Sequence, residues 1–451
     1  MTKRQFLILI VPLLAVILGL AGIGIADRAG ADPAYWDDGL VLEVRRALDR
    51  EFVWGIDEER RLPEKAFYEA VNTYIGIFDA YGEVVPPWLL EEEKDRTHGR
   101  YAGVGLLTPP HAPNQTIDSL TIDGVFPGGP ADRAGIKIGE QIVAVDRITL
   151  AELGSASRVI ERIRGPSGST VKLGVKGRDG NEREVEVVRA PISKGSVFGA
   201  RLVDADAGIG YLRIKGFFGD TDTDFRKKLE ALKEMGMVAL VLDLRQNPGG
   251  MLDTAVNVVD ALISDGIIVQ VQSRDALEVK TATPENTLAP DLPLAVLVNR
   301  GSASAAEVVA GAIQDHRRGV LVGGRTWGKF AVQTLREIPS REANAALLKI
   351  TSALYKTPNG HYYQRRYRDR RRDDPLAGLV PDLHVPVSHV DRDKLEAIFR
   401  SEEYADWREK AVSPYPDFED EALSAAVAIL RGQDVRPLLR LAEAGDLDDP
   451  Q

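Results

Sequence analysis

A serine and a lysine, Ser304 and Lys329, are the residues of this chain whose types and surroundings best fit a catalytic pair. Ser304 lies in a turn of small residues between an apolar run and a predicted helix, and Lys329 lies in a Gly-Lys turn between two strand-like runs. A serine hydroxyl becomes a good nucleophile when a base takes its proton. A lysine is such a base when burial in apolar surroundings keeps its amine neutral. The pair therefore predicts a hydrolase whose base is a lysine rather than a histidine.

The residues near Lys329 fit this role. Trp327 and Phe330 are apolar and predict a half-buried position for the amine. Gln333 lies four residues further on, and positions an even number apart share one face of a strand, so its amide is expected to orient the lysine. Each residue alone has a more ordinary interpretation, because a serine in such a turn is most often a helix cap and such a lysine a solvated charge.

A glycine-rich turn upstream supplies a third element. Residues 241–252 read as an apolar strand that runs into Asn247-Pro-Gly-Gly250 and then into an amphipathic helix. Glycines let a backbone approach a substrate closely and expose its N–H groups. Such N–H groups stabilise the negative oxygen of a tetrahedral intermediate. The alternative is an ordinary junction between a strand and a helix.

These segments together resemble the carboxyl-terminal-processing proteases, also called tail-specific proteases. The resemblance lies in residues 299–307, which read Asn-Arg-Gly-Ser-Ala-Ser-Ala-Ala-Glu, in residues 322–329, and in the Asp-Leu-Arg-x-Asn-Pro-Gly-Gly segment at 243–250. It implies that Ser304 is the nucleophile and that Lys329 is the general base.

The resemblance also assigns the supporting groups. Gln333 would support the lysine, and the oxyanion hole would use the backbone N–H of Gly250, or of its neighbour Gly249, together with that of Ala305. The chain departs from the family at two positions. Phe330 stands where glycine is common, and Ala306 stands where a second serine is common. Neither change removes a catalytic atom, but Phe330 is expected either to make the surroundings of the lysine more apolar or to narrow the substrate groove.

A histidine-based site is the main chemical alternative. In that case His316 or His361 would activate the serine, and Lys329 would be dispensable. The absence of cysteine excludes a thiol nucleophile, thiolate metal sites and disulfides. No His-Glu-x-x-His motif or carboxylate-rich loop indicates a metal, so neither a metal nor another cofactor is predicted.

The start of the chain predicts a membrane anchor. Residues 6–26 are uncharged and apolar or small, and Lys3 and Arg4 precede them. A run of this length can cross a hydrocarbon core of about 30 Å. Basic residues before it favour a cytoplasmic N-terminus, which places the catalytic part in the periplasm or outside the cell. Residues 1–28 are thus expected to be a single-pass anchor in the cytoplasmic (inner) membrane, with cleavage near residues 29–34 as the alternative.

The rest of the chain predicts a multidomain α/β protein. Residues 29–96 read as helical, and residues 97–192 resemble a PDZ domain, which is rich in strands and has two helices. Residues 193–390 alternate strands and helices and predict a protease core of β-α-β units. Residues 391–451 form a helical and acidic tail.

The PDZ resemblance implies a binding site for protein C-termini. Its carboxylate-binding loop would be Gly103, Val104, Gly105 and Leu106, whose N–H groups would hold the terminal carboxylate while the next strand pairs with the peptide. Residues 153–163 would be the helix beside the groove. Arg147 replaces a glycine that is common in PDZ domains. The alternative is a small β domain without peptide binding.

Several elements of the core are predicted from apolar periodicity. Expected strands cover residues 210–217, 238–244, 294–298, 346–355 and 379–387, and a helix is expected at 221–235. A net charge of −11 argues against nucleic-acid binding. The basic cluster at 365–372 is followed by two aspartates and is interpreted as a solvated hairpin tip.

These observations predict a membrane-anchored serine endopeptidase that captures exposed C-termini of exported proteins and delivers them to Ser304. The rival prediction is a PDZ-containing scaffold or adaptor without activity, which Phe330 favours. Whether the chain forms a homo-oligomer or binds an adaptor protein stays open.

Overall fold

The computed structural model describes residues 62–109, 115–193, 195–338, 345–365, 377–386, 388–405 and 414–434. The chain divides into two compact units, residues up to 88 with 333–351, and residues 89–332 with 352–451. The predicted anchor at 1–28 lies outside the described residues. In the part of the chain that is described, no helix has the length and apolar character needed to span a bilayer.

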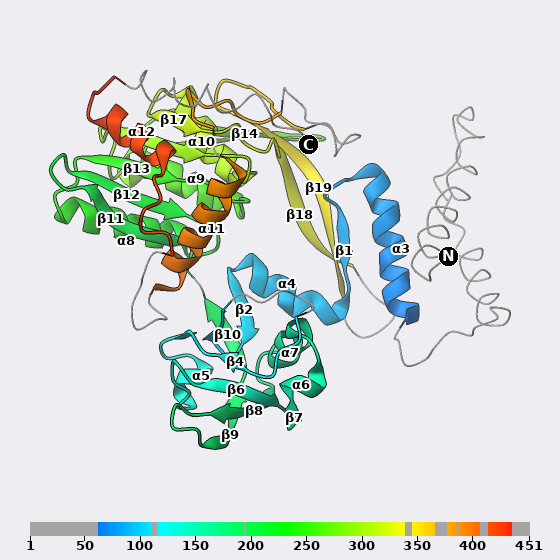
Figure 1. Ribbon diagram of the computed structural model, residues 1–451. Coiled ribbons are helices and arrows are strands. Elements are labelled where there is room, and N and C mark those ends of the chain that lie inside the picture. The colour runs from blue at the N-terminus through cyan, green and yellow to red at the C-terminus, as the bar shows by residue number, and fades with distance from the viewer. Residues whose placement is uncertain are drawn as a thin grey trace, which may run out of the picture. The chain divides into compact units, whose positions relative to one another are not determined.

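A six-stranded sheet forms the centre of the second unit (Figure 1). Pairing is parallel from β12 to β20, and β11 pairs antiparallel with β12 at one edge. Alternation of strands and helices in the sequence predicted this α/β arrangement. In sheet order, the strands are β11 (Val197–Asp204), β12 (Ile209–Ile214), β13 (Ala239–Asp243), β16 (Leu294–Val298), β17 (Val320–Gly323) and β20 (Leu383–His384).

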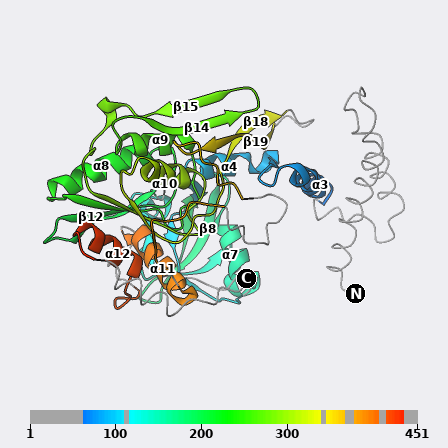
Figure 2. The same ribbon diagram turned by 90° about the horizontal axis from the view of Figure 1, so that it is seen from above.

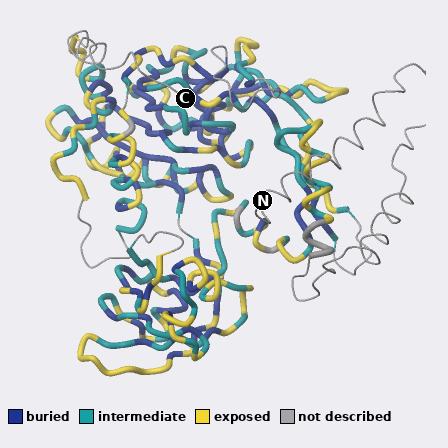
Figure 3. The backbone as a smooth tube through the Cα atoms, turned by 45° about the vertical axis from the view of Figure 1, so that its right-hand side comes forward, coloured by how far each residue is buried: buried dark blue, intermediate teal, exposed yellow. Residues whose placement is uncertain are grey.

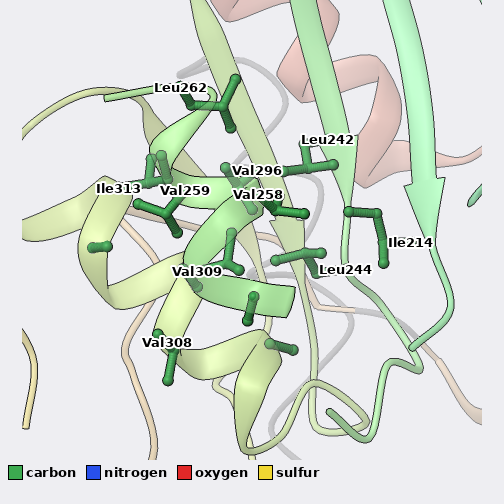
Figure 4. Packing of buried hydrophobic residues seen from close by; sticks show 14 of the residues in the cluster. Ile214, Leu242, Leu244, Val258, Val259, Leu262, Val296, Val308, Val309 and Ile313 are labelled. Carbon is green, nitrogen blue, oxygen red and sulfur yellow. The ribbon is translucent and has the colours of Figure 1, made fainter. Parts of the chain in front are cut away.

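The central strands are apolar throughout because both faces of the sheet are buried. Leu240 and Leu242 of β13 pack against helices on one face, whereas Ala239 and Val241 pack against the other layer. The first face is covered by α8 (Thr221–Glu234), α9 (Leu252–Asp260) and α10 (Ala305–Asp315), which pack side by side (Figures 1 and 2). Figure 4 shows the side chains of α9 and α10 meeting those of the strands. Buried backbone runs through the interior, with exposed segments at the periphery (Figure 3).

The last strand of the sheet is much shorter than the predicted 379–387, and that prediction is wrong. β20 covers only Leu383–His384 because the residues before it are bonded elsewhere. The N–H of Leu379 donates to the Thr326 hydroxyl, and the Leu379 carbonyl accepts the Thr326 N–H. The Asp382 carboxylate accepts the N–H of Leu321 at the start of β17. This segment therefore braces the turn after β17 instead of extending the sheet.

The opposite face of the sheet is covered by α12 (Glu421–Leu430), and α11 (His389–Glu403) packs beside β11. A buried ion network joins α12 to β13. Arg245 is 1% exposed and contacts the carboxylates of Asp243 at 2.6 Å and Asp420 at 2.7 Å. Asp420 also accepts the N–H of Leu423 and so caps α12. The chain's C-terminal region thereby stabilises the strand that leads to the glycine-rich turn.

Because of this ion network, we expect the folding stability of the protein to fall measurably at acid pH. Burial raises the pKa of Asp420, but Arg245 and the cap outweigh it, so the net pKa lies below its ordinary value of 3.8. A carboxyl with a lowered native pKa stabilises the fold above its unfolded pKa, and this contribution is lost as pH falls through the native pKa. We expect Asp420→Asn to lose about 2 kcal/mol at pH 7 and to show a flatter decline below about pH 4. Urea unfolding between pH 2 and 7 measures this, and equal slopes in both proteins would contradict it.

The small β domain has its own core, formed by residues such as Ile122, Ile142 and Leu173. The two segments that lead into and out of it, β2 (Arg100–Gly103) and β10 (Ala190–Ser193), pair antiparallel. Its remaining strands are β3 (Leu106–Leu107), β4 (Leu120–Thr121), β5 (Gly124–Val125), β6 (Gln141–Val145), β7 (Ile148–Thr149), β8 (Thr170–Lys176) and β9 (Glu182–Val188).

The helix predicted at 153–163 is divided in two. α6 (Leu150–Leu153) ends at Gly154, whose φ of 80° is left-handed, and α7 (Ala156–Ile163) begins after Ser155. The Ser155 hydroxyl accepts the N–H of Arg158 as an N-cap. α5 (Pro130–Arg133) precedes them, so the described part of this domain has three short helices rather than the predicted two.

The first unit contains α3 (Leu62–Phe78), which falls in the region predicted to be helical, residues 29–96. The same region also contains the strand β1 (Glu83–Val85). β1 pairs antiparallel with β19 (Ala346–Lys356), and β18 (Ala331–Ile338) also pairs with β19. Asp79 accepts hydrogen bonds from the N–H and hydroxyl of Thr351. The second unit also contains α4 (Leu90–Thr97) and the hairpin of β14 (Ile267–Ser273) and β15 (Leu277–Thr281). Short 3-10 helices cover Pro87–Leu89 and Pro284–Asn286.

Candidate active site

The predicted catalytic groups follow three neighbouring strands of the parallel sheet. The glycine turn follows β13, Ser304 follows β16, and the Lys329 turn follows β17. Since β13, β16 and β17 are adjacent and parallel, their carboxyl ends lie at one edge of the sheet. Active sites of open α/β sheets form at this edge. The order of strands thus explains how groups about 80 residues apart in sequence become neighbours.

Ser304 sits at the N-terminus of α10 in a strained backbone conformation. Its φ of 56° and ψ of −119° are unusual for a residue with a side chain. Such conformations persist only where surrounding contacts fix them, and they are frequent at functional sites. Here the Ser304 N–H donates to the Glu307 carboxylate at 2.8 Å, and its carbonyl accepts the N–H groups of Glu307 and Val308. The serine is half-buried.

Two backbone N–H groups beside Ser304 are suited to bind an oxyanion. Ala305 is the first residue of α10, and Gly250 ends the glycine turn. Among the described residues, neither N–H has a hydrogen-bond acceptor. The N–H of Gly249, in contrast, donates to the side-chain oxygen of Asn247 at 2.9 Å. Of the two glycines named by the resemblance, Gly250 is therefore the one with a donor available.

Both glycines are required by close backbone approach. Gly249 has φ of 100°, and a Cβ there would lie 2.7 Å from the Cβ of Ser304 and 2.9 Å from the Ala305 nitrogen. Gly250 has φ of 143°, and a Cβ there would lie 2.1 Å from the carbonyl oxygen of Phe217. Only glycine fits these positions without backbone displacement. The turn is thus pressed directly against the serine.

Glu307 joins the serine turn to the lysine turn. Its side chain is fully buried, and one carboxylate oxygen accepts the Thr326 hydroxyl at 2.6 Å and the Gly328 N–H at 2.7 Å. The other oxygen accepts the N–H groups of Ser304 and Lys329, each at 2.8 Å. Burial raises the pKa of Glu307, and these four donors partly offset the rise. The backbone nitrogens of Ser304 and Lys329 are therefore held next to the same oxygen atom.

Lys329 is half-buried, as predicted, but it does not lie on a strand. β18 begins two residues later, at Ala331, because the Lys329 N–H donates to Glu307 rather than to a strand neighbour. The argument that Gln333 shares a strand face with Lys329 is therefore wrong. Gln333 lies on β18, and its side-chain nitrogen donates to the carbonyl of Tyr81 in the first unit.

Phe330 points into the protein and does not line a groove. It is fully buried and stacks on Tyr355, with ring centroids 4.6 Å apart and planes inclined by 26°. The ring of Tyr363 meets it edge-on at 5.7 Å. A fully buried ring does not narrow a substrate groove, so Phe330 no longer favours an inactive scaffold.

The histidine alternative is wrong because both candidate histidines lie at the far end of α10. His316 follows the last residue of this helix, and its ring contacts the Ile267 carbonyl at 2.7 Å. The Nδ1 atom of His361 lies 3.9 Å from the Oδ1 atom of Asp315, the last residue of α10. An eleven-residue helix is about 16 Å long, so neither ring reaches Ser304. Within the described residues, no cluster of His, Asp or Glu suited to a metal ion occurs.

The predicted carboxylate loop of the β domain joins β2 to β3. Gly103 ends β2, Gly105 has φ of 77°, and Leu106 begins β3. The carbonyl of Val104 accepts the N–H of Ala131, and that of Gly105 accepts the N–H of Phe126, each at 2.9 Å. These contacts fix the loop on the domain and orient its carbonyls toward neighbouring backbone.

Sequence reasoning missed two residues of this site and one residue of the ion network that joins α12 to β13. Glu307 had a readable signal, because Ser-x-x-Glu before an apolar helix is the capping-box pattern. Tyr355, whose hydroxyl contacts the carbonyls of Ser304 and Lys329, had none, since it is one aromatic residue in a long strand. Asp420 also had none, because its partner Arg245 lies 175 residues away.

Comparison with known proteins agrees with this architecture. The model of peptidase family S41 matches residues 208–385, and a PDZ domain model matches residues 121–177. The chain is 34% identical over 325 residues to a carboxyl-terminal-processing protease of Picosynechococcus sp., covering 72% of this chain and 74% of that protein.

Two further matches are of the same kind. A carboxy-terminal-processing protease of Bartonella bacilliformis is 32% identical over 331 residues, covering 71% of this chain and 70% of that one. The solved photosystem II D1 C-terminal processing protease is 27% identical, with a TM-score of 0.43 and coverage of 81% and 96% of the two chains. From the family match and the identities to the Picosynechococcus and Bartonella proteases, we conclude that the chain is a serine-type peptidase of family S41, a carboxyl-terminal-processing protease with a PDZ domain.

Proposed function

We propose that this chain is a membrane-anchored endopeptidase in which Ser304 is the nucleophile and Lys329 the general base. The observation that carries the proposal is the shared oxygen of Glu307, which accepts the N–H groups of both residues. The family supplies the reaction class, which is hydrolysis of peptide bonds.

The first half of the reaction forms an acyl-enzyme. The Ser304 oxygen attacks the carbonyl carbon of the scissile bond while the neutral Lys329 amine takes the hydroxyl proton. The negative oxygen of the tetrahedral intermediate accepts the N–H groups of Gly250 and Ala305. As the intermediate collapses, the Lys329 ammonium gives its proton to the leaving amine, and the ester on Ser304 remains. The free N–H groups and the N-terminus of α10 support this assignment.

The second half releases the new C-terminus. A water molecule gives a proton to Lys329 and attacks the ester carbonyl, and the same two N–H groups hold the second oxyanion. The ammonium then returns the proton to the Ser304 oxygen. Resemblance to the family adds Gln333 as the group that supports Lys329, and its amide oxygen is the atom able to accept from an ammonium.

The PDZ domain is proposed to select substrates by their C-terminal carboxylate through residues 103–106. We expect that replacing the free C-terminus of an apolar-tailed substrate by an amide raises KM about tenfold, because a charge-assisted contact is lost. The kcat should change little, since the tail does not touch the reacting bond. Steady-state hydrolysis of the two substrates measures this, and Ser304→Ala should bind the free tail without cleaving it. Equal KM values would contradict tail selection.

The membrane anchor is proposed from residues 6–26 and would hold the peptidase at the periplasmic or outer side of the cytoplasmic membrane, where it would process exported proteins. The full chain should remain in the membrane fraction after an alkaline wash and be released only by detergent. A variant without residues 6–26 should be released by the wash alone. Release of the full chain by the wash would contradict the anchor.

A further inference from the structure

The hydroxyl of Tyr355 contacts both residues of the proposed catalytic pair. Its oxygen lies 2.8 Å from the carbonyl oxygen of Ser304 and 2.7 Å from the carbonyl oxygen of Lys329. Tyr355 lies on β19 and is 2% exposed, so its hydroxyl side of these contacts is largely shielded from water. Shielded hydrogen bonds are stronger than exposed ones and fix geometry more firmly.

The ring that carries this hydroxyl is itself held on two sides. It stacks on the buried ring of Phe330, and the Tyr355 N–H donates to the Phe330 carbonyl at 3.1 Å. Phe330 is in turn packed edge-on against Tyr363. Offset stacked and edge-on pairs are the favoured arrangements of aromatic rings. The hydroxyl therefore has little freedom to move away from the two carbonyls.

The catalytic pair needs such support because both members lie on irregular backbone. Ser304 has the strained φ of 56°, and Lys329 follows Gly328, whose φ is 89°, outside any strand. Glu307 accepts the N–H groups of the two residues, and the single O–H of Tyr355 is shared between their carbonyl oxygens. Two side chains from different elements thus fix the two turns relative to each other.

We propose that Tyr355 is a positioning residue for the reaction. Its hydroxyl sets the distance over which the proton passes from the Ser304 oxygen to the Lys329 amine. Proton transfer needs heavy atoms about 2.6–3.2 Å apart, and a displacement of about 1 Å lowers a rate by up to 10²-fold. The proposal rests on the Ser304–Lys329 mechanism proposed above.

The test is Tyr355→Phe, which removes one oxygen and keeps the stacked ring. We expect kcat to fall about tenfold or more with KM unchanged, because substrate binding does not involve this hydroxyl. The kcat is normalised to the number of serines that react with a fluorophosphonate, so that a smaller folded fraction does not count as a catalytic loss. Tyr363→Phe is the matched control, because it also removes a hydroxyl from the same aromatic cluster. The Tyr363 hydroxyl contacts neither catalytic residue, so the kcat of this variant should equal that of the parent.

A second variant, Phe330→Leu, keeps every hydrogen-bonding side chain but removes the ring that orients Tyr355. It should lower kcat by a smaller factor, again with KM unchanged. Parent-like kcat in both Tyr355→Phe and Phe330→Leu, in an assay where Lys329→Ala is inactive, would overturn the positioning role and leave the mechanism intact. Full activity of Lys329→Ala would overturn the mechanism and, with it, this proposal.

Discussion

Lys329→Ala is expected to lower kcat/KM for peptide hydrolysis on the order of 10⁴-fold or more, because removing one member of a nucleophile–base unit disables the whole unit. The serine hydroxyl would then have no group to accept its proton, and the leaving amine no group to protonate it. Residual hydrolysis would come from the oxyanion N–H groups and substrate binding alone. Steady-state assays with an unfolded protein substrate measure the loss.

Two companion variants separate a base from a mere positive charge. Lys329→Arg should be as inactive as Lys329→Ala, since a guanidinium stays protonated and cannot accept the serine proton. Lys356→Ala should keep parent activity, because Lys356 is a half-buried lysine of β19 that is not part of the site. Activity retained in Lys329→Arg would show that the charge, rather than the base, matters.

Glu307→Ala is expected to lose both activity and stability. The change leaves the N–H groups of Ser304, Gly328 and Lys329 buried without the carboxylate that accepts them. Buried donors left without partners cost about 1–3 kcal/mol each, and local relaxation returns part of this, so a net loss of about 3 kcal/mol is expected. Because the two catalytic turns lose their common anchor, kcat should fall about 10²-fold. Chemical denaturation and steady-state kinetics measure the two effects.

A matched control exists within the same chain. Glu152 closes a capping box at the start of α6 in the PDZ domain, where it accepts hydrogen bonds from Thr149. Glu152→Ala removes the same kind of helix contact at an exposed position and should leave kcat unchanged. Equal kcat in Glu307→Ala and the parent would mean that Glu307 only caps α10 and does not position the site.

The elements that carry the site were predictable because their signals are local. The strand at Leu294–Val298 occurs as expected, since a run of five apolar residues before a turn of small residues marks a buried strand. Ser304 at the start of a helix follows from the same pattern. The adjacency of the three turns required the order of the strands, which the sequence does not encode locally. Family resemblance assigned the three turns to one site, and the structure supplied the strand order.

The wrong predictions arose where tertiary contacts replaced local ones. The shared face of Lys329 and Gln333 required both residues to lie on one strand, but the Lys329 N–H donates to the buried carboxylate of Glu307 and β18 begins only at Ala331. The strand expected at 379–387 is short because Leu379 pairs with the turn at Thr326. The break at Gly154 has a local signal in the sequence. A glycine commonly follows the end of a helix and a serine commonly caps the start of the next, so this break could have been predicted.

The most direct test of the account is the rate at which a fluorophosphonate modifies the protein, with the modified residue identified by peptide mapping. The account predicts a single modified residue, Ser304. The rate of modification should fall at least 10²-fold in Lys329→Ala, a factor typical of general-base assistance. The rate should not fall in His316→Ala or His361→Ala. Modification of Ser304 at the parent rate in Lys329→Ala, or modification of a different serine, would contradict it.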